Sequence, residues 1–307
     1  MENSSHSFYF NLSIFVNIGY YSYPAFVLCL LLYGFIICAN FVIVVVISCE
    51  RALHEPMYVF IALLSINALY GSAGFFPRFL MDILSDTHLI SRPACFTQIY
   101  VIYTYAFCEV TILGVMSYDR YVAVCQPLHY HSKMTSAKLQ MLAAFALICP
   151  AIYNSISVYV SITLPLCGNN IQKVHCAGWN IAKLACVTSA ITQIAATIAA
   201  IIVSFLPICC ILYTYFRIVL VCWKSSSDFR GKVLQSCLPH IISVLIYCIT
   251  SFSDTILNIY DLKDLNPFVA ILLSIEFVVI PPVLNPLVYG LKLPEIRTHV
   301  VRMVSWK

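Results

Sequence analysis

Seven stretches of mostly apolar residues, each long enough to cross a lipid bilayer, fill nearly all of this 307-residue chain. A spanning helix needs about 20 such residues to cross roughly 30 Å of hydrocarbon, and it satisfies its own backbone hydrogen bonds there. Hydrophobic residues make up 61% of the chain and charged residues 10%, a composition that would leave a soluble protein with large apolar surfaces. The sequence therefore predicts an all-α membrane protein, a bundle of seven transmembrane helices. The predicted spans are 24–48, 57–84, 92–126, 138–162, 188–222, 230–258 and 266–291.

The distribution of Lys and Arg predicts the orientation of the bundle. If the N-terminus lies outside, 12 of the 17 Lys and Arg residues fall on the inner side and 5 on the outer side, as the positive-inside rule requires. Two glycosylation sequons, at Asn3 and Asn11, then also fall on the outer side. We expect a multi-pass plasma-membrane protein with one domain, 1–307: an extracellular segment 1–23, a helix bundle 24–291, and a cytoplasmic tail 292–307 with a short helix. The net charge of +4 then reflects membrane topology, and no nucleic-acid partner is expected.

Four of the cysteines, Cys95, Cys167, Cys176 and Cys186, fall on the predicted outer side, where disulfides persist. Four cysteines allow three pairings, and their spacing alone does not choose among them. The other eleven lie in or near spans and are interpreted as small apolar packing residues. The sequence contains no Cys-x-x-Cys pair and no His-x-x-x-His pair, so neither a metal site of that kind nor a cofactor is expected.

The third span ends in Asp119-Arg120-Tyr121. From Cys95 to Asp119 is 24 residues, or about 36 Å of helix, so the cysteine is expected at the outer mouth and the charged pair at the inner surface. A charged pair at a helix end also arises by snorkelling toward the membrane surface. The residues around the pair decide between the two readings.

The run from Met116 to Tyr130 closely resembles the signature of olfactory receptors, a family of rhodopsin-like G-protein-coupled receptors. The resemblance continues in the right order along most of the chain. The segment Leu64–Gly71 looks more like receptors of bony fish than of mammals. The other matching positions are Asn40 in the first span, Leu53–Tyr58 in the first inner loop, Lys232, Cys237 and His240 at the start of the sixth span, and Pro282–Tyr289 in the seventh.

This resemblance implies an odorant receptor, not an enzyme, that activates a heterotrimeric G protein of the stimulatory olfactory type and raises cyclic AMP. It also implies the disulfides Cys95–Cys176 and Cys167–Cys186, which would hold the second outer loop as a lid. The residues that it assigns to activation and coupling are Asp119, Arg120, Tyr121, Lys232, His240, Asn285, Pro286 and Tyr289.

Glu109 lies ten residues, or about 15 Å, outward from Asp119, near the middle of the membrane, where a carboxylate is costly and marks a functional site. Family members carry Glu at this place, near a site for sodium. The family's second-span Asp is replaced here by Ala68, beside Asn67. Two alternatives follow: sodium bound at Glu109, or a neutral, protonated Glu109 hydrogen-bonded to Asn67 or Asn285.

A ligand pocket is expected between the outer halves of the third, fifth, sixth and seventh spans, mostly apolar with a few polar groups. Aminergic receptors carry an Asp where this chain has Ile102, which argues against an ordinary monoamine receptor. Asp254 is either a partner for a cationic odorant or a solvated carboxylate at a helix end, and Glu276 in the seventh span has no explanation. The candidate ligand-binding residues are Ile102, Tyr103, Ala106, Tyr247, Ser251 and Asp254.

Three other functions fit the sequence less well. A non-olfactory rhodopsin-like receptor for another small ligand is disfavoured by the Lys-Cys-His spacing of the sixth span and by the loop cysteines. A transporter would show inverted repeats or broken helices, and a membrane enzyme would need several polar groups at one depth, where Glu109 stands nearly alone. The sequence therefore favours a receptor whose partners are a small-molecule odorant, a G protein and the lipid bilayer.

Overall fold

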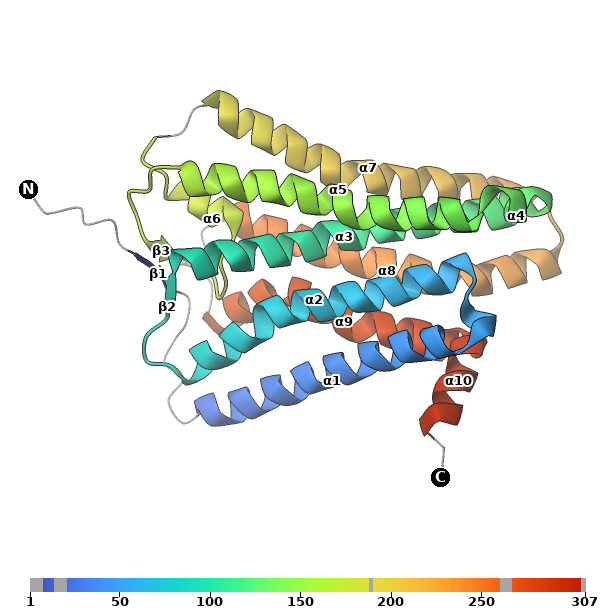
Figure 1. Ribbon diagram of the computed structural model, residues 1–307, viewed down its shortest axis with the longest axis horizontal. Coiled ribbons are helices and arrows are strands. Elements are labelled where there is room, and N and C mark those ends of the chain that lie inside the picture. Colours follow the sequence, from blue (N-terminus) through green and yellow to red (C-terminus); the bar gives the residue numbers. More distant parts are fainter. Residues whose placement is uncertain (1–7, 14–20, 188–189, 260–266, 305–307) are drawn as a thin grey trace, which may run out of the picture.

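The computed structural model describes residues 8–13, 21–187, 190–259 and 267–304. Within these ranges, seven helices are long and apolar enough to cross a membrane, and they lie alongside one another as a bundle (Figure 1). The predicted bundle is confirmed. The predicted and observed ends of the helices differ by at most three residues; the largest difference is at the start of the sixth long helix, which begins at Ser227 rather than at 230. The seven helices are α1 (Ser22–Cys49), α2 (Pro56–Leu84), α3 (Arg92–Cys125), α5 (Ser136–Thr163), α7 (Ala190–Trp223), α8 (Ser227–Ile259) and α9 (Pro267–Lys292).

Local sequence signals set where several of these helices begin. The Ser91 side chain accepts a hydrogen bond from the Ala94 amide at the start of α3, and the Thr135 side chain accepts one from the Lys138 amide at the start of α5. Both satisfy an amide that the helix itself leaves unpaired. Helix α2 begins with Pro56 in its first turn, where the missing N–H costs nothing.

Helix α3 is the centre of the bundle. In its most apolar stretch 72% of the residues are buried, against 17% in α5 and in α7, which turn most of their surface toward lipid. Two glycines let α2 approach α3 closely: a Cβ added at Gly71 would collide with the Tyr105 ring, and one at Gly74 would collide with Val101. Small residues at a helix interface allow this kind of close packing in membranes.

Two prolines inside helices leave carbonyls without their helical donors, and neighbouring helices supply replacements. Pro286 has no N–H for the carbonyl four residues earlier, and the Asn40 side chain of α1 donates to that Pro282 carbonyl at 2.9 Å. In α5, Pro150 likewise frees the Ala146 carbonyl, which accepts from the Thr111 hydroxyl of α3 at 2.7 Å. These bonds tie α1 to α9 and α3 to α5.

One end of the bundle carries a small sheet, formed by β1 (Tyr9–Leu12), β2 (Leu89–Ser91) and β3 (Asn170–Ile171), together with the short helix α6 (Gly178–Lys183). Strand β1 lies in the middle, antiparallel to β2 and parallel to β3. We call this the outer end, because it holds the predicted outer loops. Asn11 lies in β1, whereas Asn3 lies outside the described residues.

The opposite end carries the predicted inner loops and the C-terminal segment (Figure 1). Its elements are short: η2 (Arg51–Leu53), η3 (Pro127–His129), α4 (Tyr130–Lys133) and α10 (Pro294–Val304). Helix α10 is the short C-terminal helix that the sequence predicts. We call this the inner end.

Candidate ligand-binding and coupling sites

The second outer loop, between α5 and α7, is fixed by two disulfides. Cys95 of α3 is bonded to Cys176, and Cys167 is bonded to Cys186 within the loop. These are the two pairings that the resemblance implies. Cys95 and Cys176 are fully buried beneath the sheet, so the loop is held directly over the outer end of α3.

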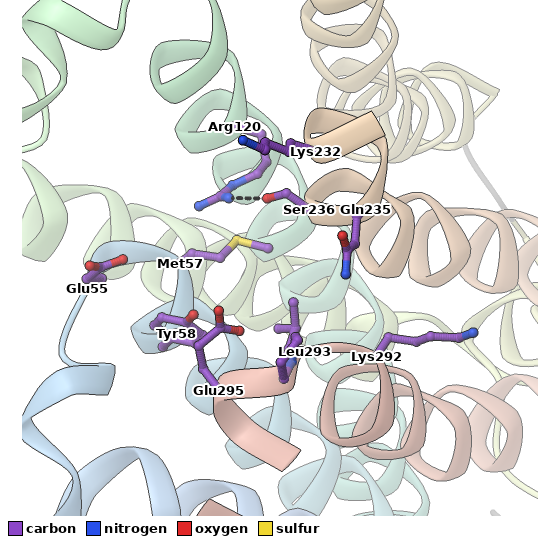
Figure 2. A pocket seen from close by; sticks show the side chains of 11 residues that line it. Glu55, Met57, Tyr58, Arg120, Lys232, Gln235, Ser236, Lys292, Leu293 and Glu295 are labelled. Atoms are coloured by element: carbon purple, nitrogen blue, oxygen red, sulfur yellow. Dashed lines mark hydrogen bonds between the residues drawn. The ribbon is translucent and has the colours of Figure 1, made fainter. Parts of the chain in front are cut away.

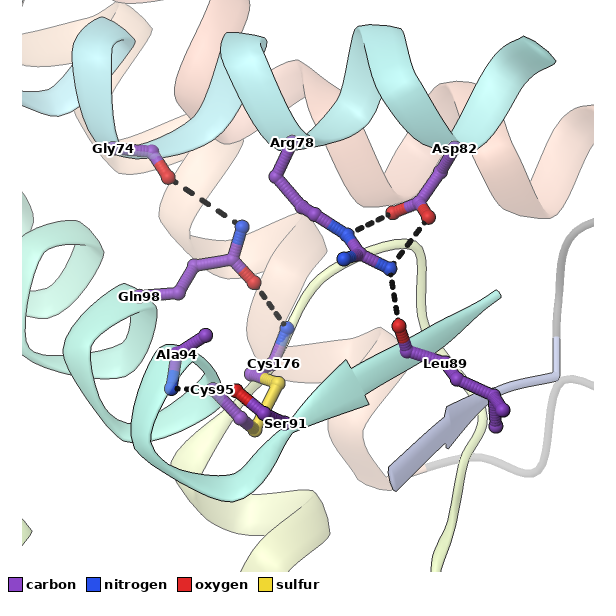
Figure 3. The surroundings of a disulfide bond; sticks show 9 residues. All are labelled: Gly74, Arg78, Asp82, Leu89, Ser91, Ala94, Cys95, Gln98 and Cys176. Atoms are coloured by element: carbon purple, nitrogen blue, oxygen red, sulfur yellow. Dashed lines mark hydrogen bonds and ion pairs between the residues drawn. A yellow bond between two sulfur atoms is a disulfide. The ribbon is translucent and has the colours of Figure 1, made fainter. Parts of the chain in front are cut away.

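Hydrogen bonds around the first disulfide connect the loop to α2 as well (Figure 3). The Gln98 side chain accepts from the Cys176 amide at 3.0 Å and donates to the Gly74 carbonyl of α2 at 3.4 Å. Arg78 pairs with Asp82 through two hydrogen bonds and also donates to the Leu89 carbonyl of β2. The lid is therefore held on α3 and, through Gln98, on α2, and Arg78 fixes the first outer loop to α2.

Asp254 is not the solvated carboxylate that one reading of the sequence expected. It accepts a hydrogen bond from the Lys173 ammonium at 2.6 Å, and this ion pair joins the second outer loop to α8. The Lys173 side chain is 1% exposed and the Asp254 side chain 19%. Sequence reasoning missed Lys173, because a loop lysine gives no signal that it turns inward.

The residue beside this pair, His175, is also buried. The pKa of His175 is lowered from 6.5 to about 3, mainly by burial and also by the charge of Lys173, whereas the charge of Asp254 partly opposes the shift. The imidazole is therefore neutral at physiological pH. Its ring packs edge-on against Phe75 of α2, with ring centroids 5.9 Å apart.

The predicted ligand-binding residues fall into two groups. Ile102, Ala106 and Tyr247 belong to one buried apolar cluster, which also includes the loop residue Val174. Tyr103 instead packs against a second apolar cluster beneath the outer sheet. The Ser251 hydroxyl is buried and makes no hydrogen bond of standard geometry among the residues that the structure describes, but it lies close to the Tyr247 hydroxyl.

Tyr103 belongs to a different cluster for a geometric reason. Consecutive residues of a helix point about 100° apart, so the Tyr103 side chain is turned to one side of the direction in which Ile102 points. Its phenol nevertheless lies close enough to Asp254 for the two to interact electrostatically.

Mid-bundle, Glu109 has one of the two partners that the sequence offered. The Asn285 amide donates to one Glu109 carboxylate oxygen at 2.8 Å, whereas the Asn67 amide donates to the Tyr105 carbonyl instead. Glu109 Oε2 and Asn285 Oδ1 are buried and make no hydrogen bond of standard geometry in the described part of the chain, although the Tyr105 hydroxyl lies close to the Glu109 carboxylate. Such oxygens suit either a proton on Glu109 or a sodium ion. The described residues hold no cluster of three or more His, Cys, Asp or Glu side chains that would bind a metal.

At the inner end, Arg120 joins α3 to α8. Its guanidinium pairs with the adjacent Asp119 at 2.7 Å and donates to the Ser236 hydroxyl at 2.9 Å. The other Asp119 oxygen accepts from the Tyr130 hydroxyl at 2.8 Å. Sequence reasoning assigned neither Ser236 nor Tyr130, although Tyr130 ends the quoted signature and Ser236 precedes Cys237.

A cavity of about 270 Å³ opens next to Arg120 (Figure 2). Three basic side chains, Arg120, Lys232 and Lys292, face it together with two acidic ones, Glu55 and Glu295. The cavity is bounded by α2, α3, α8 and the junction of α9 with α10. Its remaining lining residues are Met57, Tyr58, Gln235, Ser236, Leu293 and Pro294.

His240 connects three helices above this cavity. One ring nitrogen lies 3.0 Å from the Leu113 carbonyl of α3, and the other lies 2.7 Å from the Tyr215 hydroxyl of α7. Because a carbonyl only accepts, Nε2 carries the hydrogen, and Tyr215 must donate to Nδ1. Of the other predicted coupling residues, Asn285, Pro286 and Tyr289 are buried, whereas Tyr121 is half-buried and accepts from Gln126.

The fold is that of a rhodopsin-like G-protein-coupled receptor. The chain superimposes on the crystal structure of squid rhodopsin with a TM-score of 0.75, covering 95% of this chain and 87% of that one. The two sequences are 16% identical, so this likeness shows the fold alone.

The family follows from closer sequence relatives. Residues 28–307 match the family model described as "Olfactory receptor". Olfactory receptor 4B13 of Mus musculus is 33% identical over 283 residues, covering 92% of this chain and 90% of the relative. Olfactory receptor 10A7 of Homo sapiens is 30% identical over 300 residues, covering 95% and 94%. The chain belongs to the olfactory receptor family.

Members of this family are receptors of the plasma membrane that cross it several times, and they are not enzymes. The predicted class and location are therefore confirmed, and the outer end is the extracellular one. The similarity to bony-fish receptors stays a prediction.

Proposed function

We propose that this receptor binds a small odorant in the outer half of the bundle and activates a heterotrimeric G protein of the stimulatory olfactory type, which raises cyclic AMP. The observation that carries the proposal concerns one helix. Helix α8 holds Tyr247, Ser251 and Asp254 near its outer end and Ser236, the partner of Arg120, near its inner end. Ser236 and Asp254 are 18 residues apart, or about 27 Å along the helix. A movement of α8 that begins at Asp254 would therefore also displace Ser236.

The odorant is assigned to the region beneath the disulfide-held loop. Ile102, Ala106 and Tyr247 would supply apolar walls, and Ser251, Asp254 and Tyr103 would supply polar groups. A ligand shifts the receptor toward another conformation only by binding that conformation more tightly. Tyr247 and Asp254 lie on α8, so a ligand that contacts them favours one position of this helix over another.

Coupling is assigned to the inner end. Arg120, with Asp119 and Tyr121, would rearrange when the Ser236 contact breaks, and Lys232 on the rim of the cavity would meet the G protein. His240 and Tyr289 lie on α8 and α9 at the depth where these helices would separate. Asn285 and Pro286 would let α9 bend, because Pro286 removes one helical hydrogen bond. The single receptor domain, 1–307, would thus carry both sites.

The proposal is tested in cells that express the receptor, the stimulatory olfactory G protein and a cyclic AMP reporter. The cells are challenged with volatile odorants, amines, amino acids, bile acids and prostaglandins. We expect at least one compound to raise cyclic AMP in the wild type and none to do so in Arg120→Ala at equal surface display. A response through another G protein class alone would contradict the coupling assignment.

A further inference from the structure

The ion pair between Lys173 and Asp254 lies at the outer end, where the ligand is assigned. Lys173 comes from the loop and is 1% exposed, whereas Asp254 comes from α8 and is 19% exposed. A lysine is almost never fully buried unless it is paired. The pair therefore joins the lid to the helix that carries Tyr247, and a ligand entering beneath the lid meets two opposite charges.

One further polar group near the pair is left without a hydrogen bond. His175 Nδ1 is buried and without a partner among the described residues. His175 is 3% exposed and feels the charges of both Lys173 and Asp254. Buried polar atoms in native structures are usually satisfied. An unpaired imidazole nitrogen beside an ion pair therefore points to a polar ligand at this place.

The charges restrict what that ligand is. A cationic ligand that takes Asp254 leaves the Lys173 ammonium, which is 1% exposed, without this anion, and an anionic ligand that takes Lys173 separates the loop from α8. Removing one partner of a buried ion pair is strongly unfavourable, because the other charge stays desolvated. A ligand that carries both charges replaces both partners at once.

We propose that Lys173 and Asp254 are the recognition pair for a zwitterionic ligand, an amino acid, whose carboxylate binds Lys173 and whose ammonium binds Asp254. The inference deepens the proposed function, since it names the ligand class of the same site. The ligand separates the pair and stands between its two halves, so the loop and α8 stay connected through the ligand. His175 and Ser251 lie where they can bond to the ligand's remaining polar atoms.

The test is direct binding, which does not depend on a G protein. The purified full-length receptor is placed in lipid nanodiscs, and its melting temperature is followed while each of the twenty standard amino acids is added. For every amino acid that binds, the amine lacking the carboxylate and the acid lacking the ammonium are compared. We expect at least one amino acid to stabilise the wild type at a tenfold or more lower concentration than either analogue.

Substitutions then show whether the ion pair binds the ligand or only holds the loop on α8. Asp254→Asn should move the preference to the acid, and Lys173→Met should move it to the amine, each by tenfold or more. Either single variant breaks the ion pair and risks failing to fold. The exchange Lys173→Asp with Asp254→Lys keeps the pair, and it should retain amino-acid binding within about tenfold and still discriminate against both analogues. A control at an exposed lysine, Lys224→Met, should change nothing.

Three results would overturn the inference. They are that no amino acid binds the wild type, that the amine or the acid binds as well as the amino acid, or that the substitutions weaken all compounds equally. Failure of the proposed function is distinguishable. A cyclic AMP response to neutral odorants without amino-acid binding would support the proposed function and contradict the amino acid as ligand. Amino-acid binding without any cyclic AMP response would support the amino acid as ligand and contradict the proposed G-protein coupling.

Discussion

The Arg120 guanidinium and the Ser236 hydroxyl, 116 residues apart in the chain, lie 2.9 Å apart and connect α3 to α8. The same guanidinium stays paired with Asp119, so of the Arg120 contacts only the Ser236 bond has to break for the inner end of α8 to move away. A hydrogen bond to a charged group contributes roughly 1.5–3 kcal/mol when buried. This one is partly buried, and we take about 1 kcal/mol.

Ser236→Ala should therefore raise signalling in the absence of odorant. Losing about 1 kcal/mol from the conformation described here shifts the equilibrium about fivefold toward the active state. Basal cyclic AMP per displayed receptor, measured in reporter cells, should rise severalfold. Ser227→Ala, at an exposed position near the start of the same helix, is the matched control. An unchanged basal level in Ser236→Ala would show that this bond does not hold the receptor inactive.

Arg120→Ala should abolish the cyclic AMP response but leave odorant binding intact. Arg120 lies 18 residues from Ile102 along α3, about 27 Å away, so it does not touch a ligand beneath the outer loop. Surface display, ligand-induced stabilisation and cyclic AMP are measured on the same cells. A full response at equal display would contradict the role of Arg120, and loss of ligand binding would mean that the substitution disturbs the whole bundle.

Loss of the Cys95–Cys176 bond should be more harmful than loss of Cys167–Cys186. The first spans 81 residues and the second 19. Chain entropy then assigns roughly 4.5 kcal/mol to the first and roughly 3 kcal/mol to the second. Replacing each pair by Ser and staining intact cells should show a larger loss of display for Cys95→Ser/Cys176→Ser. Equal display of the two variants would mean that the sheet and Gln98 hold the loop without the first bond.

The sequence predicts the bundle well because each span needs only length and apolar composition, and these are local properties. Contacts that close between distant segments are not local. Nothing near Lys173 in the chain shows that it meets Asp254, 81 residues later. The aromatic N-terminal segment likewise gives no sign that Phe10 and Leu12 are fully buried beneath the outer sheet. Both contacts lie at the outer end, where the Cys95–Cys176 bond holds the second loop on α3.

The residues of the candidate sites likewise fall into those that the sequence identifies and those that only the fold brings together. Arg120 and Asn285 stand in short motifs whose pattern is visible in the chain, so the sequence finds them. Ser236, which completes the inner contact, is an ordinary serine whose role comes only from the approach of α8 to α3. Tyr103 was grouped with Ile102 by its place in the chain, but a helix turns adjacent residues to different faces.

Glu109→Gln should distinguish the two states of the central carboxyl group. One carboxylate without a second nearby is a poor sodium site, and a proton would satisfy Glu109 at lower cost in an apolar core. We therefore expect Glu109→Gln, which keeps an oxygen for the Asn285 amide, to retain display and melting temperature. Exchange of sodium for choline should not alter the melting temperature of the wild type. Sodium-dependent stability that disappears in the variant would establish the ion instead.

Acid should loosen the outer loop through His175. Burial lowers the pKa of His175 from 6.5 to about 3 in the closed loop, whereas an opened loop would return the pKa to its ordinary value. The open form then binds more protons below pH 6.5, so the closed form loses stability progressively from pH 6.5 down to about 3 and is unaffected above pH 6.5. Between pH 6.5 and pH 5 the loss approaches about 2 kcal/mol. Hydrogen exchange of the loop amides should accelerate on acidification in the wild type. His175→Gln, which does not titrate, should remove most of that acceleration while leaving the contribution of other groups. The same pH dependence in both proteins would show that His175 takes up its proton without opening the loop.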